Sequence, residues 1–129
     1  MKKILIMVLC LLLCMTACAA PDPTENGNLP EGVSYAIEVV DTAGNPIPGA
    51  MVVLCQDKEG GTCYMPGSTD ENGIAYFHSN MIPVQNDMKV RVLMAEGYDL
   101  PLDDSGDIRY TQIPDGTVYM TLQLEKIEN

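Results

Sequence analysis

Short segments in which apolar and polar residues alternate make up much of the chain after residue 33. The clearest are MKVRVLMA at 88–95 and TVYMTLQLE at 117–125, and Gly and Pro residues separate such segments from one another. Successive side chains of a strand point to opposite faces, so a period of two places one face on a core and the other in water. This pattern predicts an all-β domain.

The same pattern predicts seven strands between residues 33 and 129. They are expected at 34–41, 50–56, 61–65, 73–78, 88–95, 107–112 and 117–125. In the last two alternating segments the expected inward residues are Met88, Val90, Val92, Met94, Val118, Met120, Leu122 and Leu124. Seven short strands separated by turns predict an antiparallel, immunoglobulin-like β-sandwich.

Residues 1–17 have the pattern of a lipoprotein signal peptide. Two lysines precede Ile4–Met15, an unbroken apolar run of 12 residues, which is too short for a bilayer span of about 20 residues and typical of a signal-peptide core. The run ends in Thr16-Ala17-Cys18, which resembles a bacterial lipobox with Cys18 as the lipidated residue. The alternative is ordinary cleavage after an alanine, which would release a soluble secreted protein.

Lipidation at Cys18 would attach the protein to a membrane, because a diacylglycerol supplies the two acyl chains that stable anchoring needs. Residues 18–32, CAAPDPTENGNLPEG, are rich in Pro, Asn, Gly and acidic residues, a composition typical of a flexible tether. The expected location is the extracellular face of a bacterial, Gram-positive cell membrane.

The charge of the chain argues against nucleic acid as a partner. The sequence has 18 acidic and 7 basic residues, and loss of residues 1–17 would change the net charge from −11 to −13. Such a surface repels phosphate backbones.

The segment STDENGIAYF at 68–77 permits two interpretations. Asp70, Asn72 and Gly73 are residue types of a calcium loop, but a helix-loop-helix calcium loop beginning at Ser68 would need an acidic residue where Ser79 stands. Asp and Asn begin type I turns well, and Gly accepts a positive φ. We therefore expect a hairpin turn with a Gly bulge between the third and fourth strands.

Three segments carry a family resemblance: DTAGNPIPGAMV at 41–52, TDENGIAYF at 69–77 and EGY at 96–98. They resemble the prealbumin-like β-sandwich modules, which include carboxypeptidase regulatory-like domains and the B-type repeats of collagen adhesins. The resemblance covers about 90 residues and implies the fold more than a function, because its motifs are turns and core positions.

The resemblance also suggests activities that the residues argue against. Isopeptide cross-links of adhesin repeats need a Lys in the first strand and an Asn in the last, and the expected strands have neither. Enzymes of this fold use several His residues, whereas His78 is the single histidine of the chain. His78 is expected to be a strand-end residue, and neither a catalytic set nor a cofactor is expected.

The acidic cluster Asp103, Asp104 and Asp107 is a weak metal candidate. Carboxylates of this kind can hold calcium weakly in extracellular modules, although a run of this type is more often a solvated loop. We expect no metal there.

Cys55 and Cys63 are expected to form a disulfide. Cys10 and Cys14 leave with the signal peptide and Cys18 carries lipid, so two of the five cysteines remain, outside the cytosol where disulfides persist. The alternatives are free thiols buried as small hydrophobes or a thiol pair for redox or zinc chemistry. A hairpin would bring the two Cα atoms to about 4.5–5.5 Å.

Two non-enzymatic functions follow from these observations. The first is a membrane-tethered extracellular module for adhesion, ligand binding or structure, with a surface protein or glycan as its partner. The second is an accessory carbohydrate-binding lipoprotein, in which exposed tyrosines would stack on sugar rings. The candidates for this stacking are Tyr64, Tyr76, Tyr98, Tyr110 and Tyr119, and the chain has no Trp.

Lipidation can be tested by changing Cys18 to Ala. The variant should stay unprocessed or be released, because the acceptor thiol is lost, and membrane fractionation with intact-mass measurement would show either result. A variant that matures and fractionates with membranes like the parent would show that Cys18 is not the anchor.

Overall fold

The computed structural model describes residues 29–56, 62–113 and 116–128. Residues 1–28, with Cys18, lie outside the described residues. The described part has eight strands and no α-helix: β1 (Val33–Asp41), β2 (Met51–Gln56), β3 (Gly67–Ser68), β4 (Ile74–His78), β5 (Met88–Met94), β6 (Tyr98–Asp99), β7 (Thr111–Gln112) and β8 (Tyr119–Lys126). Within that part, no helix could span a membrane by its length and apolar character.

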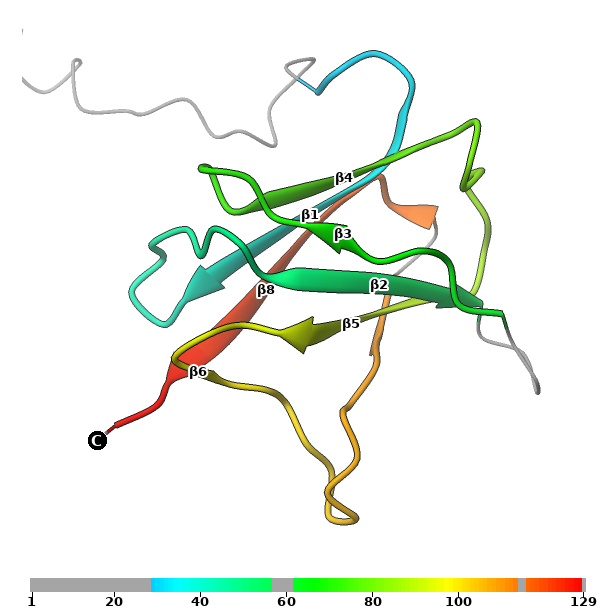
Figure 1. Ribbon diagram of the computed structural model, residues 1–129. Coiled ribbons are helices and arrows are strands. Elements are labelled where there is room, and N and C mark those ends of the chain that lie inside the picture. The colour runs from blue at the N-terminus through cyan, green and yellow to red at the C-terminus, as the bar shows by residue number, and fades with distance from the viewer. Residues whose placement is uncertain (1–28, 57–61, 114–115, 129) are drawn as a thin grey trace, which may run out of the picture.

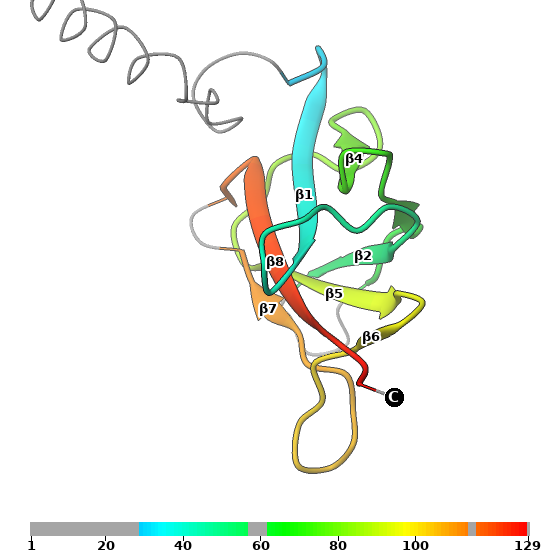
Figure 2. The same ribbon diagram turned by 90° about the vertical axis from the view of Figure 1, so that its left-hand side faces the viewer.

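The strands form two four-stranded sheets, as expected for a sandwich (Figures 1 and 2). The first sheet has the order β4-β1-β8-β6 and the second the order β3-β2-β5-β7. In Figure 2, β1 and β8 of the first sheet run across β2 and β5 of the second. The all-β prediction is therefore confirmed.

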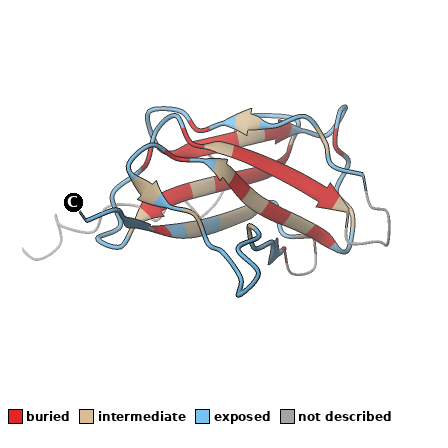
Figure 3. Cartoon of the chain, turned by 60° about the horizontal axis from the view of Figure 1, so that its bottom comes forward, coloured by how far each residue is buried: buried red, intermediate tan, exposed pale blue. Residues whose placement is uncertain are grey.

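The core lies between the sheets and is built from alternate residues of the long strands (Figure 3). β1 contributes Tyr35, Ile37 and Val39, which are fully buried, while β2 contributes Val52 and Leu54. The hydroxyl of the buried Tyr35 accepts a hydrogen bond from the backbone N–H of Gln85 at 2.8 Å and donates to its carbonyl at 3.2 Å. A polar tip inside the core is tolerable because it is hydrogen-bonded.

The prediction of seven strands is wrong, because the described part of the chain has eight. The expected strand at 61–65 is reduced, in its described part, to an isolated bridge between Cys63 and Cys55. The two-residue strands β3 and β6 were not expected, because two residues are too few to show an alternating pattern.

The expectation of purely antiparallel sheets is also wrong. β1 pairs with β8 in parallel, with Ile37 opposite Met120 and Val39 opposite Leu122. Alternation predicts which face of a strand is buried but not the direction of its neighbour. Two residues expected inside, Met94 and Val118, are exposed because each stands at or beyond the end of its strand.

The disulfide between Cys55 and Cys63 is present, with the two Cα atoms 4.0 Å apart, which is closer than a hairpin predicted. It ties the segment after β2 back to β2 itself. The Tyr110 hydroxyl lies 3.8 Å from the sulfur of Cys55 and 3.9 Å from that of Cys63. The Arg91 guanidinium packs over the Tyr110 ring at 4.8 Å, a favourable cation–π distance.

The turn at 70–73 has the predicted local geometry. Gly73 has a φ of 74°, its N–H donates to the Asp70 carbonyl at 2.9 Å, and the Asp70 N–H donates to the Ile74 carbonyl at 3.0 Å. These bonds form a type I turn followed by a Gly bulge. The hairpin itself is absent, because β3 and β4 belong to different sheets and the turn carries the chain from one sheet to the other.

Thr69 and Gly73 join this crossing to the Pro- and Gly-rich segment before β2. The buried Thr69 hydroxyl donates to the Ile47 carbonyl at 2.7 Å and accepts from the Ala50 N–H at 2.8 Å. At Gly73, a Cβ would lie 2.8 Å from the Val39 carbonyl oxygen. Two of the sequence motifs, 41–52 and 69–77, thus pack against each other.

Gly73→Ala should destabilise the fold more than Gly44→Ala does. Both glycines have a positive φ, but a Cβ at Gly44 meets no atom within 4 Å, so that change should cost about 1 kcal/mol for the backbone alone. At Gly73 the clash adds an overpacking cost, for a total on the order of 3 kcal/mol. Urea unfolding of the two variants gives the comparison, and equal losses would contradict the tight packing at Gly73.

Candidate functional site

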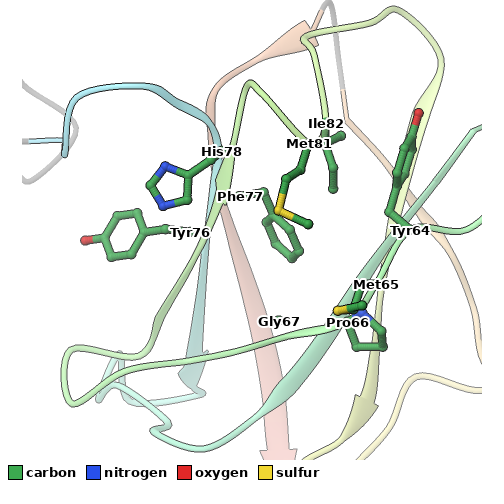
Figure 4. Close-up of a pocket in the computed structure, with 9 residues that line it drawn as sticks. All are labelled: Tyr64, Met65, Pro66, Gly67, Tyr76, Phe77, His78, Met81 and Ile82. Atoms are coloured by element: carbon green, nitrogen blue, oxygen red, sulfur yellow. The ribbon is translucent and has the colours of Figure 1, made fainter.

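The structure has an apolar pocket at the side of the sandwich where the edges of β3 and β4 meet (Figure 4). Its volume is about 220 Å³. Its walls come from the segment before β3, from β4, and from the turn after β4; the lining residues are Tyr64, Met65, Pro66, Gly67, Tyr76, Phe77, His78, Met81 and Ile82. Most of the lining is therefore apolar.

Two methionines leave this pocket open to solvent. Met65 is 75% exposed and Met81 is 64% exposed, although both contribute to an apolar wall. In Figure 4, the Met81 side chain extends over the Phe77 ring. Methionine side chains are flexible and polarizable, and they are frequent on binding surfaces that adapt to a ligand.

Local features of the sequence shape the pocket. Gly67 permits β3 to approach β4, because a Cβ at Gly67 would lie 3.1 Å from the Phe77 ring. After β4 the chain turns sharply, since the N–H groups of Met81 and Ile82 both donate to the His78 carbonyl, at 3.0 and 2.9 Å. This turn places Met81 beside the strand that it follows.

The charge near the pocket is negative. Asp70 and Glu71 stand in the turn before β4 and are exposed. Burial raises the pKa of the Tyr76 hydroxyl, and the nearby Asp70 carboxylate raises it further. No lysine or arginine is among the residues that line the pocket.

The acidic cluster at 103–107 is a turn rather than a built cation site. The Asp103 carboxylate oxygen Oδ1 accepts hydrogen bonds from the Ser105 hydroxyl at 2.5 Å, the Ser105 N–H at 2.9 Å and the Asp107 N–H at 3.2 Å. These hydrogen bonds hold the pKa of Asp103 below its ordinary value, and the bond from the Ser105 hydroxyl has the largest effect. Among the described residues, no group of three His, Cys, Asp or Glu could hold a metal ion.

The same turn occurs three times among the described residues, at Asp41, Asp70 and Asp103. In each copy the carboxylate accepts the N–H groups two and four residues later, and a glycine three residues later has a positive φ. Hydrogen bonds, chiefly from the Asn45 N–H, likewise lower the pKa of Asp41. The predicted turn of Asp70, Asn72 and Gly73 is one example of this local motif.

His78 stands at the end of β4, as expected, and is exposed. Figure 4 shows its imidazole beside the Tyr76 ring and away from Met81. The tyrosines proposed for sugar stacking lie on several elements, and two of them fall in one row: Tyr76 and Tyr119 both pair with Ala36, on either side of β1. Burial, with Glu38 nearby, raises the pKa of Tyr119 to about 12.

Sequence reasoning missed Met65, Met81 and the pocket between them. The segment at 61–65 was expected to be a strand, and the residues after His78 had no pattern that indicated a pocket wall. The one signal in the sequence is the position of the two methionines: Met65 precedes Pro66, and Met81 follows the end of the expected strand at 73–78. Such positions could have suggested that both side chains are exposed.

The turns at Asp41 and Asp103 predict a change in acid stability. Because folding lowers both pKa values, the carboxylates stabilise the fold above the ordinary pKa of 3.8, and this contribution is lost as the pH falls below it. The double variant Asp41→Asn, Asp103→Asn keeps one acceptor oxygen at each position, enough for the two backbone N–H groups, but cannot titrate. Thermal melts between about pH 6 and pH 2.5 should therefore fall less steeply for the variant, and parallel curves would contradict this.

No protein family model and no curated protein matches the sequence. Among solved structures, the Bacillus anthracis TIE protein is similar, with 20% identity and a TM-score of 0.52 over 74% of this chain. This chain covers 16% of that protein. The major plantain pollen allergen Pla l 1 has 17% identity and a TM-score of 0.46, with 71% of this chain and 93% of that chain covered. At such identities, the first similarity supports the β-sandwich fold alone.

Proposed function

We propose that the protein is a bacterial lipoprotein whose β-sandwich is a non-enzymatic, extracellular binding module. The observation that carries this proposal is the apolar pocket beside β4, with two exposed methionines in its wall. Exposed apolar side chains around a concavity are costly in water, and they are typical of ligand or protein contact sites. The apolar run before Cys18 supports a membrane tether.

The chemistry of the pocket supports binding rather than catalysis. Its lining has one imidazole, that of His78, and no Ser, Cys, Asp, Glu or Lys. A catalytic site needs a nucleophile or acid beside a base that can exchange protons with it. The pocket residues offer mostly apolar surface, which suits recognition, and the Tyr64 hydroxyl already accepts hydrogen bonds from the side chains of Gln56 and Gln85.

We also propose the prealbumin-like, carboxypeptidase regulatory-like family for this module. Both the sequence motifs and their arrangement in the structure support this family. The motif segments 41–52 and 69–77 meet through Thr69 and Gly73 at the crossing between the sheets. Motifs that make a shared tertiary contact are stronger support than isolated turns.

A second candidate function is carbohydrate binding on the outer face of the first sheet. Tyr76 and Tyr119 flank Ala36 in one row across β4, β1 and β8, and neighbouring strands are about 4.8 Å apart. Two rings on either side of a small residue could stack on a sugar chain. Both tyrosines are only partly exposed, which favours the pocket as the main site.

A displayed peptide library and a glycan array would separate the two functions. We expect peptide ligands, and the variant Met65→Lys, Met81→Lys should weaken their binding at least about tenfold, because it charges an apolar wall. Met94→Lys is the matched control, since Met94 is 55% exposed and lies outside the pocket. Glycan binding that the variant Tyr76→Ala, Tyr119→Ala abolishes would favour the second function. Ligands that bind the variant Met65→Lys, Met81→Lys as well as the parent would exclude the pocket as the binding site.

A further inference from the structure

β4 differs from the other strands at the sheet edges. The four edge strands are β4 and β6 in the first sheet and β3 and β7 in the second. β3, β6 and β7 have two residues each, whereas β4 has five. Short edges are one way in which proteins prevent pairing with other chains, and β4 is the edge strand without that protection.

The residues of β4 do not protect its edge in other ways. Its sequence, IAYFH, contains no Lys, Pro or Gly, which are the residues that commonly disfavour pairing at an edge. The strand is regular where it pairs with β1 from Glu38↔Ile74 to Tyr35↔Phe77, and the register shifts only at its end, where Val33 lies opposite His78. Residues 74–77 of β4 therefore offer a regular template for another strand.

The register with β1 decides which backbone groups of β4 face outward. The Val39 N–H donates to the Gly73 carbonyl at 2.8 Å, and Ala75 and Phe77 follow at intervals of two opposite β1. Backbone groups alternate in direction along an antiparallel strand. The N–H and C=O of Tyr76 and the N–H of His78 therefore face the free edge.

The ends of this edge are closed by local bonds. The Asp70 carboxylate accepts a hydrogen bond from the outward N–H of Ile74, and the Asp70 N–H donates to the Ile74 carbonyl, both at 3.0 Å. The His78 carbonyl accepts from Met81 and Ile82. Between these ends, the outward groups of Tyr76 and the His78 N–H have no strand partner among the described residues.

The apolar pocket lies along the same edge. It is lined by Tyr76 and His78 as well as by Phe77 and Met81 (Figure 4), so a chain that pairs with β4 would place alternate side chains over it. In strand addition, backbone hydrogen bonds supply affinity and pockets for alternate side chains supply specificity. Both elements are present at β4.

The charges indicate what kind of chain would pair there. Asp70 and Glu71 flank the start of β4, while the described basic residues, Lys89, Arg91, Arg109 and Lys126, are on β5, on β8 and in the segment before β7. A second copy of the protein has a net charge of −13 after loss of residues 1–17, and like charges disfavour its approach to this edge. A partner segment with basic residues beside an apolar stretch fits better.

We propose that β4 binds an extended peptide segment of another protein by strand addition, with alternate apolar side chains in the pocket and basic residues toward Asp70 and Glu71. This inference rests on the proposed function, because it concerns the same pocket. It adds the mode of binding and the chemistry of the partner.

The probe is a synthetic peptide, KKVTLTVTL, with a series of analogues that carry one N-methyl group each. It is titrated against the protein after removal of residues 1–18, with Met94→Lys as a control for the surface. Saturable binding is expected, and N-methylation should weaken it about tenfold at alternate positions only, since every second N–H would face β4. The amide of Tyr76 should exchange more slowly with solvent when the peptide is bound.

On the protein, Tyr76→Pro removes the outward N–H and leaves the ladder to β1 intact, as edge prolines can. It should abolish peptide binding, and if the variant does not fold, the N-methyl series still decides. Failure of the peptide to bind would overturn the inference, as would a dimer of the protein that Tyr76→Pro dissociates.

If N-methylation does not weaken peptide binding at every second position, strand addition is wrong. The proposed binding function would still stand if the variant Met65→Lys, Met81→Lys weakens peptide binding. Binding that the methionine variant does not weaken would instead contradict the proposed function itself.

Discussion

The crossing between the sheets at residues 69–73 is the contact on which the rest of the structure depends. Thr69 is hydrogen-bonded to Ile47 and Ala50, and Gly73 packs without a side chain against the Val39 carbonyl. The site has no room for a side chain, and Gly73 has none. The chain can therefore pass from β3 in one sheet to β4 in the other, where β4 pairs with β1. The neighbouring edges of β3 and β4, and hence the pocket, result from this passage.

The same passage explains why the candidate site is at an edge rather than on a sheet face. β3 has only two residues, and its first, Gly67, lies against the Phe77 ring. The segment before β3 then spreads away from β4, and the turn after β4 places Met81 on the opposite side of the opening. The disulfide between Cys55 and Cys63 fastens the nearby end of β2 to the segment that carries Tyr64. In the chain-entropy model, so short a loop contributes about 2–3 kcal/mol.

Prediction from the sequence worked best for features that depend on a few neighbouring residues. The turn at Asp70 to Gly73 was predicted with its Gly bulge, since both Asp70 bonds and the φ of Gly73 are local. The inward faces of β5 and β8 were predicted except at Met94 and Val118, where the strands end. The cysteine pairing was predicted from their number and spacing. The exposed methionines Met65 and Met81 were missed, because their exposure depends on how β3 and β4 are placed in the tertiary structure.

The sequence by itself determined the fold class, the turn at Asp70 to Gly73 and the disulfide, because alternation, turn chemistry and cysteine spacing act within short stretches of chain. Tertiary structure alone decided that β1 and β8 run parallel, that β3 and β4 lie in different sheets, and that β4 is the long free edge beside an apolar pocket. The physical reason is that period-two alternation specifies a buried face but not a neighbour. Neighbours are chosen when the two sheets close over a shared core, at contacts such as Gly73 and Thr69 that join residues distant in sequence.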